Sequence, residues 1–435
     1  MTTTQATISR RHFLVKSTAV TSSLVCFPYV VSAAAFGKQR QVAAGDRITM
    51  GVIGVGGRGR AVMQSFLELP GAQVVAVCDV NKERRRLAQQ MVDEKYDKKV
   101  CKTYHDFREL LSRPDIDAVL IASPVFWHVI MATEAARHGK DMYMEKPVGL
   151  RFAEARILRQ TIHRYARVFQ FGTQQRSDRN FRFACELARN ARIGRVHTIR
   201  VGVPSGDWRP RFPQKPVPQD LDYEAWVGPA PWSPYTEAIL NGQMHERISL
   251  YSLGFISAWG VHHLDIAQWG NGTELTGPTE VEGKAVFPDE GVLDCAKSWQ
   301  VNLKYPNGVT IQFTDNAKNK QGVRFEGESG WVHVNRQELT ASPASLLKET
   351  IGPNELHMPV SDNHSQNFLD CVKSRQQTVA PVAVAVRSDT VCQLSDIATR
   401  TQRKLKWDPV REEFVGDAQA NRYLLLRPMR SPWHL

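Results

Sequence analysis

The part of the chain that most constrains the fold is a glycine-rich turn between two apolar runs. Residues 48–53 are apolar, as in a short strand, and glycines spaced Gly-x-Gly-x-x-Gly follow directly at Gly54, Gly56 and Gly59. A helical pattern comes next, and then a second apolar run that ends at Asp79. The glycine spacing alone is weak evidence. Strand, glycines, helix, strand and terminal acid within about 32 residues are typical of a dinucleotide-binding fold.

The same segment predicts how a dinucleotide is held. Gly54 permits the tight turn, Gly56 lets the backbone approach a pyrophosphate, and Gly59 lets the helix pack closely on the strand. The N–H groups and dipole at the start of the helix favour the diphosphate. Asp79 is placed to accept hydrogen bonds from the adenosine ribose and to repel a 2′-phosphate, which favours NAD over NADP. The basic run at residues 82–86 is the alternative, because it could accommodate a phosphate.

The alternation of apolar runs and helical segments continues over residues 36–173. Six such runs predict a doubly wound parallel sheet, the Rossmann fold of the α/β class. Ligands of these sheets bind at the carboxyl ends of the strands. Ser123 and Pro124 follow one of the runs, and Glu145 and Lys146 follow the next. We therefore expect these four residues at the cofactor site.

Residues 174–435 have a different pattern. An irregular region rich in Pro and Trp spans residues 204–235, several alternating runs typical of strands follow, and two helical patterns close the chain. Long irregular segments of this kind are commonly functional. This half is predicted to be an α+β domain with a mostly antiparallel sheet.

The first residues carry the pattern of an export signal. The pair Arg10 and Arg11 precedes an apolar stretch at residues 17–31 and a run of small residues at 32–35. A basic region, an apolar region and a cleavage site in this order predict a twin-arginine signal peptide over residues 1–35. We expect the twin-arginine export machinery as a partner and a periplasmic location. Because this route carries folded proteins, we also expect the cofactor to be tightly bound before export.

Composition excludes several function classes. The 435 residues carry 56 Lys+Arg and 44 Asp+Glu, but the basic residues are spread along the chain, so we expect no nucleic-acid partner. Beyond the signal, no apolar run reaches the roughly 20 residues of a spanning helix, so we expect no stable membrane insertion. The seven cysteines, one of them in the signal, form no Cys-x-x-Cys pair, so we expect no metal site.

Several motifs give the mature chain a family resemblance. They are the glycine turn with its flanks (residues 51–59), the Ser-Pro pair with His128, and Met-Glu-Lys-Pro at residues 144–147. With these the chain resembles the Gfo/Idh/MocA oxidoreductases, which include glucose–fructose oxidoreductase and inositol dehydrogenase. Residues 172–176 and 259–270 resemble the exported, planctomycete-type subgroup. The resemblance implies an open-faced sheet in the second domain, whose exposed face commonly makes a homodimer or homotetramer.

The resemblance also implies residue roles. It places Lys146 beside the nicotinamide and the substrate, where the ammonium can stabilise alkoxide character, and the peptide before the following proline is often cis. The catalytic histidine of the family falls on His262, which can shuttle a proton. The expected catalytic residues are Lys146 and His262. The expected substrate-binding residues are Gln174, Arg176, His263 and Asp265. The expected cofactor-binding residues are Gly54, Gly56, Gly57, Arg58, Gly59, Asp79, Ser123, Pro124, His128, Glu145 and Lys146.

Two positions depart from the family pattern. The family generally has an aspartate four residues before the catalytic histidine, and that position is Ala258 here. Asp207 or Asp265 could supply the missing carboxylate. Val125 and Phe126 stand where relatives often have Asp-His, which predicts a more apolar pocket near the cofactor.

Three functions fit these residues. The first is an NAD(P)-dependent dehydrogenase that acts by hydride transfer on the hydroxyl or carbonyl of a sugar, sugar derivative or cyclitol. The second is a glycoside-cleaving enzyme that uses the same bound NAD for transient oxidation and elimination and then reduces the product. The third is a non-catalytic sugar-binding protein, which Ala258 favours and in which His262 and His263 are core histidines. A small-molecule carbohydrate is the expected partner in each.

Overall fold

The structure, a computed structural model, describes residues 42–205, 212–242 and 244–435. The chain divides into two compact units, residues 1–47 and residues 48–435. The described part of the first unit contains one short 3-10 helix, η2 (Ala44–Asp46). The predicted signal peptide lies outside the described residues. The elements below belong to the second unit.

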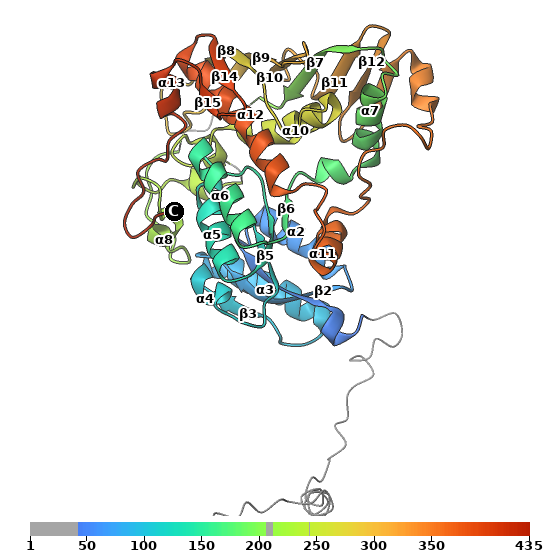
Figure 1. Ribbon diagram of the computed structural model, residues 1–435. Helices are drawn as coiled ribbons and strands as arrows, with labels where there is room; N and C mark the ends of the chain where they lie inside the picture. Colours follow the sequence, from blue (N-terminus) through green and yellow to red (C-terminus); the bar gives the residue numbers. More distant parts are fainter. Residues whose placement is uncertain (1–41, 206–211, 243) are drawn as a thin grey trace, which may run out of the picture. The chain divides into compact units, whose positions relative to one another are not determined.

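The first sheet contains six parallel strands in the order β3-β2-β1-β4-β5-β6 (Figure 1). The chain enters at the middle of the sheet, builds one edge and then the other, which is the predicted doubly wound order. The strands are β1 (Ile48–Ile53), β2 (Ala72–Cys78), β3 (Lys102–Tyr104), β4 (Ala118–Ile121), β5 (Asp141–Met144) and β6 (Phe169–Phe171). The connecting helices are α2 (Gly57–Leu67), α3 (Lys82–Tyr96), α4 (Phe107–Leu111), α5 (Val125–Arg137) and α6 (Phe152–Arg164).

Local sequence explains where these elements begin. All four residues of β4 are buried, since helices cover both faces of a parallel sheet and its central strands are apolar throughout. Helix α3 begins after Asn81, whose side chain accepts a hydrogen bond from the N–H of Arg84. This cap fixes the start of α3 three residues after Asp79 and so places the basic run beside the ends of the central strands.

The second sheet contains nine strands in the order β13-β12-β11-β7-β10-β9-β8-β14-β15. Strand β7 pairs parallel with β10, and the other neighbouring pairs are antiparallel. The strands are β7 (Val196–Val203), β8 (Glu280–Val286), β9 (Ser298–Lys304), β10 (Thr310–Asp315), β11 (Gly322–Gly327), β12 (Gly330–Val334), β13 (Leu339–Ser342), β14 (Leu405–Asp408) and β15 (Glu413–Phe414). The predicted fold class, a Rossmann sheet followed by a mostly antiparallel sheet, is confirmed.

Helices cover one face of this second sheet. Helices α7 (Arg179–Arg189), α10 (Gly260–Asn271) and α12 (Val382–Thr401) pack against it, and α12 also contacts α6 (Figure 1). Every residue of α10 from Gly260 to Gly270 is buried, including its histidines. The opposite face carries polar side chains such as Arg200 and Gln300, both exposed. Polar groups on α10 therefore lie inside the protein, between the two sheets.

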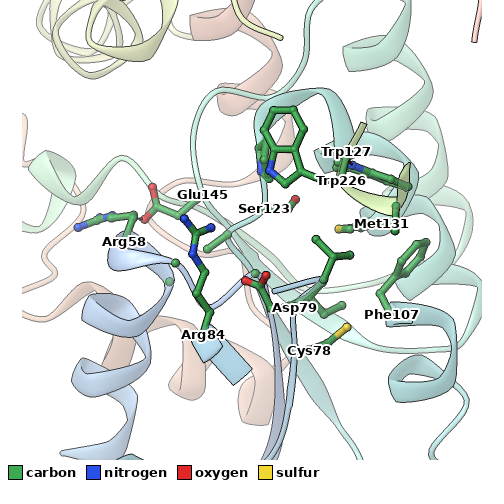
Figure 2. Close-up of a pocket in the computed structure, with 18 of the residues that line it drawn as sticks. Arg58, Cys78, Asp79, Arg84, Phe107, Ser123, Trp127, Met131, Glu145 and Trp226 are labelled. Carbon is green, nitrogen blue, oxygen red and sulfur yellow. Dashed lines mark hydrogen bonds and ion pairs between the residues drawn. The ribbon is translucent and has the colours of Figure 1, made fainter. Parts of the chain in front are cut away.

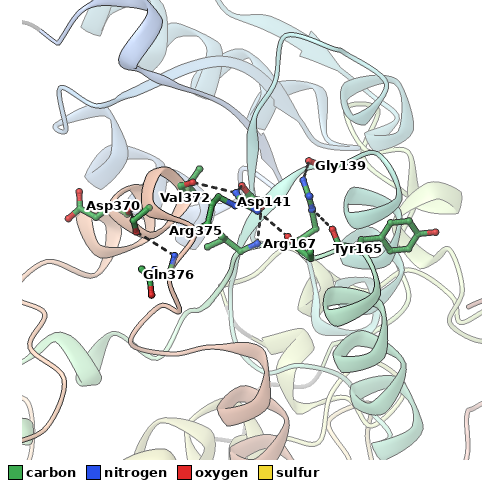
Figure 3. A network of polar contacts seen from close by, with 11 residues as sticks. Gly139, Asp141, Tyr165, Arg167, Asp370, Val372, Arg375 and Gln376 are labelled. Carbon is green, nitrogen blue, oxygen red and sulfur yellow. Dashed lines mark hydrogen bonds and ion pairs between the residues drawn. The ribbon is translucent and has the colours of Figure 1, made fainter.

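Helix α11 (His364–Ser374) returns from the second half of the chain to the first sheet (Figure 1). Its Phe368 lies in the same buried cluster as Phe66 of α2, with ring centroids 6.1 Å apart. Just beyond the helix, Arg375 donates to the Asp141 carboxylate at the start of β5 and, at 3.0 Å, to the carbonyl of Ala166 (Figure 3). The core of the first sheet thus includes a late segment. The predicted boundary between residues 173 and 174 stays a prediction.

Two further observations concern the class of protein. In the described ranges, no helix combines the length and apolarity that a membrane crossing requires. Cys78, Cys101, Cys185, Cys295, Cys371 and Cys392 are buried and unpaired. Within the same ranges, no three His, Cys, Asp or Glu side chains gather as they would around a metal ion.

Candidate active site

A cavity of about 640 Å³ lies at the carboxyl ends of the first sheet. The glycine turn after β1 and Lys146 after β5 line it. Asp79 after β2 and Ser123 after β4 also line it (Figure 2). Other parts of the wall come from later segments. These include α8 (Tyr223–Val227), η4 (Glu237–Ile239), η5 (Met244–Arg247) and Trp433. The fold therefore brings the predicted dinucleotide residues and Lys146 to one site.

Two glycines of the turn are required by the backbone itself. Gly54 has φ +83°, and a Cβ there would lie 2.6 Å from the carbonyl carbon of Ala122. A Cβ on Gly59 would lie 1.9 Å from the carbonyl oxygen of Gly54. Helix α2 begins at Gly57 without a side-chain cap, which leaves the N–H groups of its first turn to a ligand. A backbone cradle at a helix N-terminus fits a diphosphate.

Asp79 lies beside this turn. Its Oδ2 accepts from the N–H of Val55 and its Oδ1 from the N–H of Asn81, both at 2.9 Å. Burial raises the pKa of the Asp79 carboxyl, and the nearby Arg84 and the two hydrogen bonds oppose that rise. Arg84 is the one member of the basic run at 82–86 that lines the cavity. The carboxylate and one cation of the run thus face the same space (Figure 2).

Glu145 organises the residues next to Lys146. It is 3% exposed, and its Oε1 accepts from Nη2 of Arg58 at 2.8 Å and from Nε2 of Gln174 at 3.0 Å. Burial alone would raise the pKa of Glu145, but Arg58 and Lys146 outweigh it, so the pKa is lowered. Glu145 is therefore a carboxylate that holds Arg58 at the edge of the glycine turn (Figure 2). Arg58 and Glu145 line the cavity, and Gln174 lies behind them.

Lys146 lines the cavity at the end of β5. The peptide bond between Lys146 and Pro147 is cis, as the resemblance implies. The Nζ atom donates to the backbone carbonyl of Ala258 at 2.9 Å. Ala258 ends α9 (Phe255–Ala258), so a carbonyl oxygen holds the ammonium near the position where the family has a carboxylate side chain. Among the described residues, Lys146 makes no ion pair.

His262 lies on the other side of Ala258 in the sequence, on α10. It is 4% exposed, and within the described part of the chain its buried Nδ1 has no hydrogen-bond partner. Burial first, and then the charges of Lys146 and Arg336, lower the pKa of His262 well below its usual value. The imidazole is therefore neutral at pH 7, and its surroundings disfavour the protonated form. His262 does not line the cavity itself.

The other polar residues of α10 are bound within the protein. His263 contacts the carbonyl of Gly202 through Nδ1 at 2.9 Å, and burial lowers the pKa of His263 to about 4. Asp265 accepts from Arg176 at 2.7 and 3.0 Å and from the Ser388 hydroxyl at 2.7 Å.

These contacts correct one expectation. Asp265 does not supply the carboxylate missing at Ala258, because both of its oxygens are held by other side chains, and Asp207 lies outside the described residues. Arg176 also pairs with Glu274 at 2.8 Å, so Arg176 and Asp265 form a buried ion-pair group. Their predicted substrate contacts, like those of Gln174 and His263, stay predictions.

Ser123, Pro124 and His128 connect two strand ends. Ser123 and Pro124 line the cavity, and the Ser123 hydroxyl is buried without a partner in the described part of the chain. His128 is 1% exposed, and its ring nitrogens lie 2.6 Å from the Pro147 carbonyl and 2.8 Å from the Ser123 carbonyl. His128 thus holds the end of β4 to the segment after β5. Its predicted contact with the cofactor stays a prediction.

Aromatic residues form much of the remaining wall. Trp127, Trp226 and Trp433 line the cavity, and the rings of Trp127 and Trp433 lie 4.6 Å apart. Phe126 packs 5.4 Å from Trp226, in the core behind the wall. Val125 is buried as well, and neither Val125 nor Phe126 lines the cavity. The apolar character expected from these two residues comes instead from the tryptophans.

Sequence reasoning missed two residues that come from irregular segments. His245 of η5 lines the cavity, and within the described residues its buried Nδ1 has no partner. Arg336, in the turn after β12, lies beside the ring of Trp259 near His262. Neither residue belongs to a periodic pattern. The one available signal was the long Pro- and Trp-rich region, which predicted function nearby but no particular side chain.

The fold and the cavity define a dinucleotide-dependent oxidoreductase. Residues 48–173 match the model of the oxidoreductase family, NAD-binding Rossmann fold, and residues 207–435 match that of the oxidoreductase family, C-terminal alpha/beta domain. The chain belongs to the Gfo/Idh/MocA oxidoreductase family.

Three known proteins illustrate the similarity. The oxidoreductase YrbE of Bacillus subtilis is 24% identical over 73% of this chain and 78% of its own. An alpha-N-acetylgalactosaminidase of Shewanella oneidensis is 34% identical over 34% of this chain and 35% of its own, so the match spans about a third of that relative. The WlbA dehydrogenase of Bordetella pertussis, solved with NADH and UDP-GlcNAcA, has a TM-score of 0.62 at 14% identity. It covers 83% of this chain and 99% of its own, and it supports the fold.

Proposed function

We propose that this protein is an exported oxidoreductase that uses NAD to oxidise or reduce a hydroxyl or carbonyl carbon of a sugar, sugar derivative or cyclitol. The observation that carries the proposal is one cavity that both the glycine turn with Asp79 and the Lys146 side chain line. The glycine turn with Asp79 fits a dinucleotide. Lys146 presents an ammonium that has no ion-pair partner among the described residues.

Different residues of the cavity would bind different parts of the dinucleotide. The N–H groups at the start of α2 would hold the diphosphate, and the Asp79 carboxylate would accept hydrogen bonds from the ribose hydroxyls, which favours NAD over NADP. When bound, the nicotinamide supplies the acceptor or donor of the hydride. With the ligands bound, the tryptophan wall would exclude water from this space and so strengthen the polar contacts inside it.

Lys146 and His262 have the proton-transfer roles. The Lys146 ammonium, held by the Ala258 carbonyl, donates a hydrogen bond to the reacting oxygen and stabilises negative charge that develops there. The neutral imidazole of His262 accepts the hydroxyl proton during oxidation and returns it during reduction. Because no carboxylate side chain stands at Ala258, His262 works without the partner that would raise its basicity.

The first test is direct. The purified protein should contain nicotinamide dinucleotide, and a panel of sugars should change the absorbance of the reduced cofactor. Lys146→Met should lower turnover by about 10²- to 10⁴-fold with the dinucleotide still bound. Lys406→Met, at an exposed lysine of β14, is the matched control and should behave as wild type. Full turnover by the Lys146 variant would refute its assigned role.

Redox-assisted glycoside cleavage is the second candidate. It is supported by the similarity to the alpha-N-acetylgalactosaminidase and uses the same cavity. Release of an aryl aglycone without net cofactor reduction would favour this candidate over a dehydrogenase. A protein that binds sugar but neither reduces cofactor nor cleaves glycosides would be the non-catalytic alternative.

Export and assembly complete the proposal. The pattern of residues 1–35 supports transport to the periplasm through the twin-arginine pathway. Replacement of both Arg10 and Arg11 by lysine should leave the protein in the cytoplasmic fraction when cells are fractionated. The open polar face of the second sheet supports a homodimer or homotetramer, which light scattering of the purified protein would detect.

A further inference from the structure

The surroundings of His262 contain more positive than negative charge. Lys146, Arg58 and Arg336 are the cations whose charge acts on His262. Glu145 pairs with Arg58 and so neutralises one of them. The positive charges of Lys146 and Arg336 remain near His262; Lys146 lines the cavity, and Arg336 lies outside the cavity wall.

Arg336 is held in position by its turn. The turn joins β12 to β13, and the Asn335 side chain fixes it by accepting from the N–H groups of Gln337 at 2.8 Å and Glu338 at 3.0 Å. The Arg336 side chain is exposed, and its guanidinium carbon lies 5.0 Å from the centroid of the Trp259 ring. Stacking on an aromatic ring orients the guanidinium before a ligand arrives.

Two residues connect Arg336 to His262. The Trp259 ring lies 6.0 Å from the His262 ring. The Gln175 amide, oriented to satisfy its neighbours, donates to the His262 carbonyl at 2.8 Å and accepts from Nε of Arg336 at 3.3 Å. Within the described residues, the remaining guanidinium N–H groups have no hydrogen-bond partner.

Neither Arg336 nor Lys146 has a carboxylate partner within the described residues. The carboxylates whose charge acts on Arg336 are Glu145 and Asp178. Glu145 holds Arg58, and Asp178 caps α7 by accepting from two backbone N–H groups. An independent sign of a missing partner is Nδ1 of His262, which is buried and has no hydrogen bond in this part of the structure.

We propose that the substrate carries a carboxylate that Arg336 binds, so that the protein acts on an acidic sugar of the uronic acid class. This inference rests on the proposed function and adds the substrate class. The planar guanidinium fork matches a carboxylate through two parallel hydrogen bonds. Lys146 is then left to the oxygen of the reacting carbon, and the two unbalanced cations meet a substrate of opposite charge.

The test compares acidic and neutral sugars on the purified protein with its bound nucleotide. Binding of D-glucuronate and D-galacturonate is measured by calorimetry against D-glucose and D-galactose, at low and high salt. We expect the uronates to bind at least about tenfold more tightly than the neutral sugars. Arg336→Ala should lower the affinity for uronates by about tenfold to hundredfold and leave the affinity for neutral sugars unchanged. Arg336→Lys, which keeps the charge and loses the fork, should fall between wild type and Arg336→Ala.

Arg195→Ala is the matched control. Arg195 lies directly before β7, its side chain is 83% exposed, and it pairs with Glu328 at 3.1 Å, so its loss should leave sugar binding unchanged. Equal binding of neutral sugars and uronates, or uronate binding that Arg336→Ala does not weaken, would overturn the inference. Tighter binding of glucose 6-phosphate than of uronate would overturn the carboxylate assignment. A uronate preference in a protein without bound nucleotide would refute the proposed function and leave this inference intact.

Discussion

Replacement of Gly59 by alanine tests whether the glycine turn holds α2 for a dinucleotide. A Cβ at this position would lie 1.9 Å from the carbonyl oxygen of Gly54, more than 1 Å inside the 3.0 Å that real Cβ atoms respect. The contacted atom belongs to the backbone, so no side chain can move aside. The start of α2 and the turn must separate, at a cost of about 1–3 kcal/mol in the free energy of unfolding.

The same separation moves the N–H groups that would hold the diphosphate. A displacement of this size weakens binding by about a hundredfold, on the scale that a 1 Å misplacement carries at an active site. Thermal melting measures the first effect, and titration with NADH measures the second. Wild-type melting together with wild-type NADH affinity in Gly59→Ala would refute the reasoning.

Alanine substitutions at two neighbouring glycines test the effect on folding separately from the effect on NADH binding. A Cβ on Gly57 would meet no atom within 4 Å, so Gly57→Ala should melt no lower than wild type. A Cβ on Gly56 would meet only the flexible end of Arg84, at 3.6 Å, so Gly56→Ala should also fold normally. It should nevertheless bind NADH more weakly, because the added methyl group stands where the backbone would approach the ligand.

Three further predictions concern residues around the cavity and in the core. His245→Ala should lower kcat/KM about tenfold or more without release of the dinucleotide, because its unpartnered imidazole lines the cavity, and unchanged kinetics would contradict that role. Arg176→Ala should destabilise the protein by about 3–5 kcal/mol, because it leaves Asp265 buried without its cation, and a wild-type melting temperature would argue against a structural ion pair. Burial raises the pKa of Asp389 to about 7, above roughly 4 in the unfolded chain, so its contribution to stability is lost as pH rises from about 4 to 7. The free energy of unfolding of Asp389→Asn should therefore exceed that of wild type by up to about 4 kcal/mol at pH 8 and by little at pH 4. An equal difference at both pH values would refute this titration.

The strands and helices of the first sheet could be predicted from the sequence because the patterns that indicate them are local. Each strand is a short apolar run, and each helix follows its own turn. The glycine spacing, followed by Asp79 after the next strand, identifies the edge of the sheet at which a ligand binds. Since parallel strands end at one edge, the meeting of Asp79, Ser123 and Lys146 at one cavity could also be predicted. The short strands β13, β14 and β15 could not, because a strand of four residues or fewer carries little periodicity.

The rest of the site depends on packing between distant segments. Nothing near Arg336 in the sequence indicates that its turn reaches Trp259, 77 positions earlier in the numbering of the chain. Arg176 and Asp265 were recognised as polar residues of the family pattern, but their pairing with each other appears only when α10 is placed. Tertiary contacts of this kind decide whether a charged residue serves a ligand or the core.

Helix α11 has a consequence for how the protein is made. Phe368 and Arg375 complete the core around α2 and β5, so a ribosome synthesises some 200 residues after β6 before the nucleotide-binding half can close. During that interval the apolar side of α2 is open to chaperones and to aggregation. A Rossmann module cut out at residue 173 would keep this defect permanently. Exchange of nucleotide-binding halves between relatives should therefore succeed only when α11 is transferred with them.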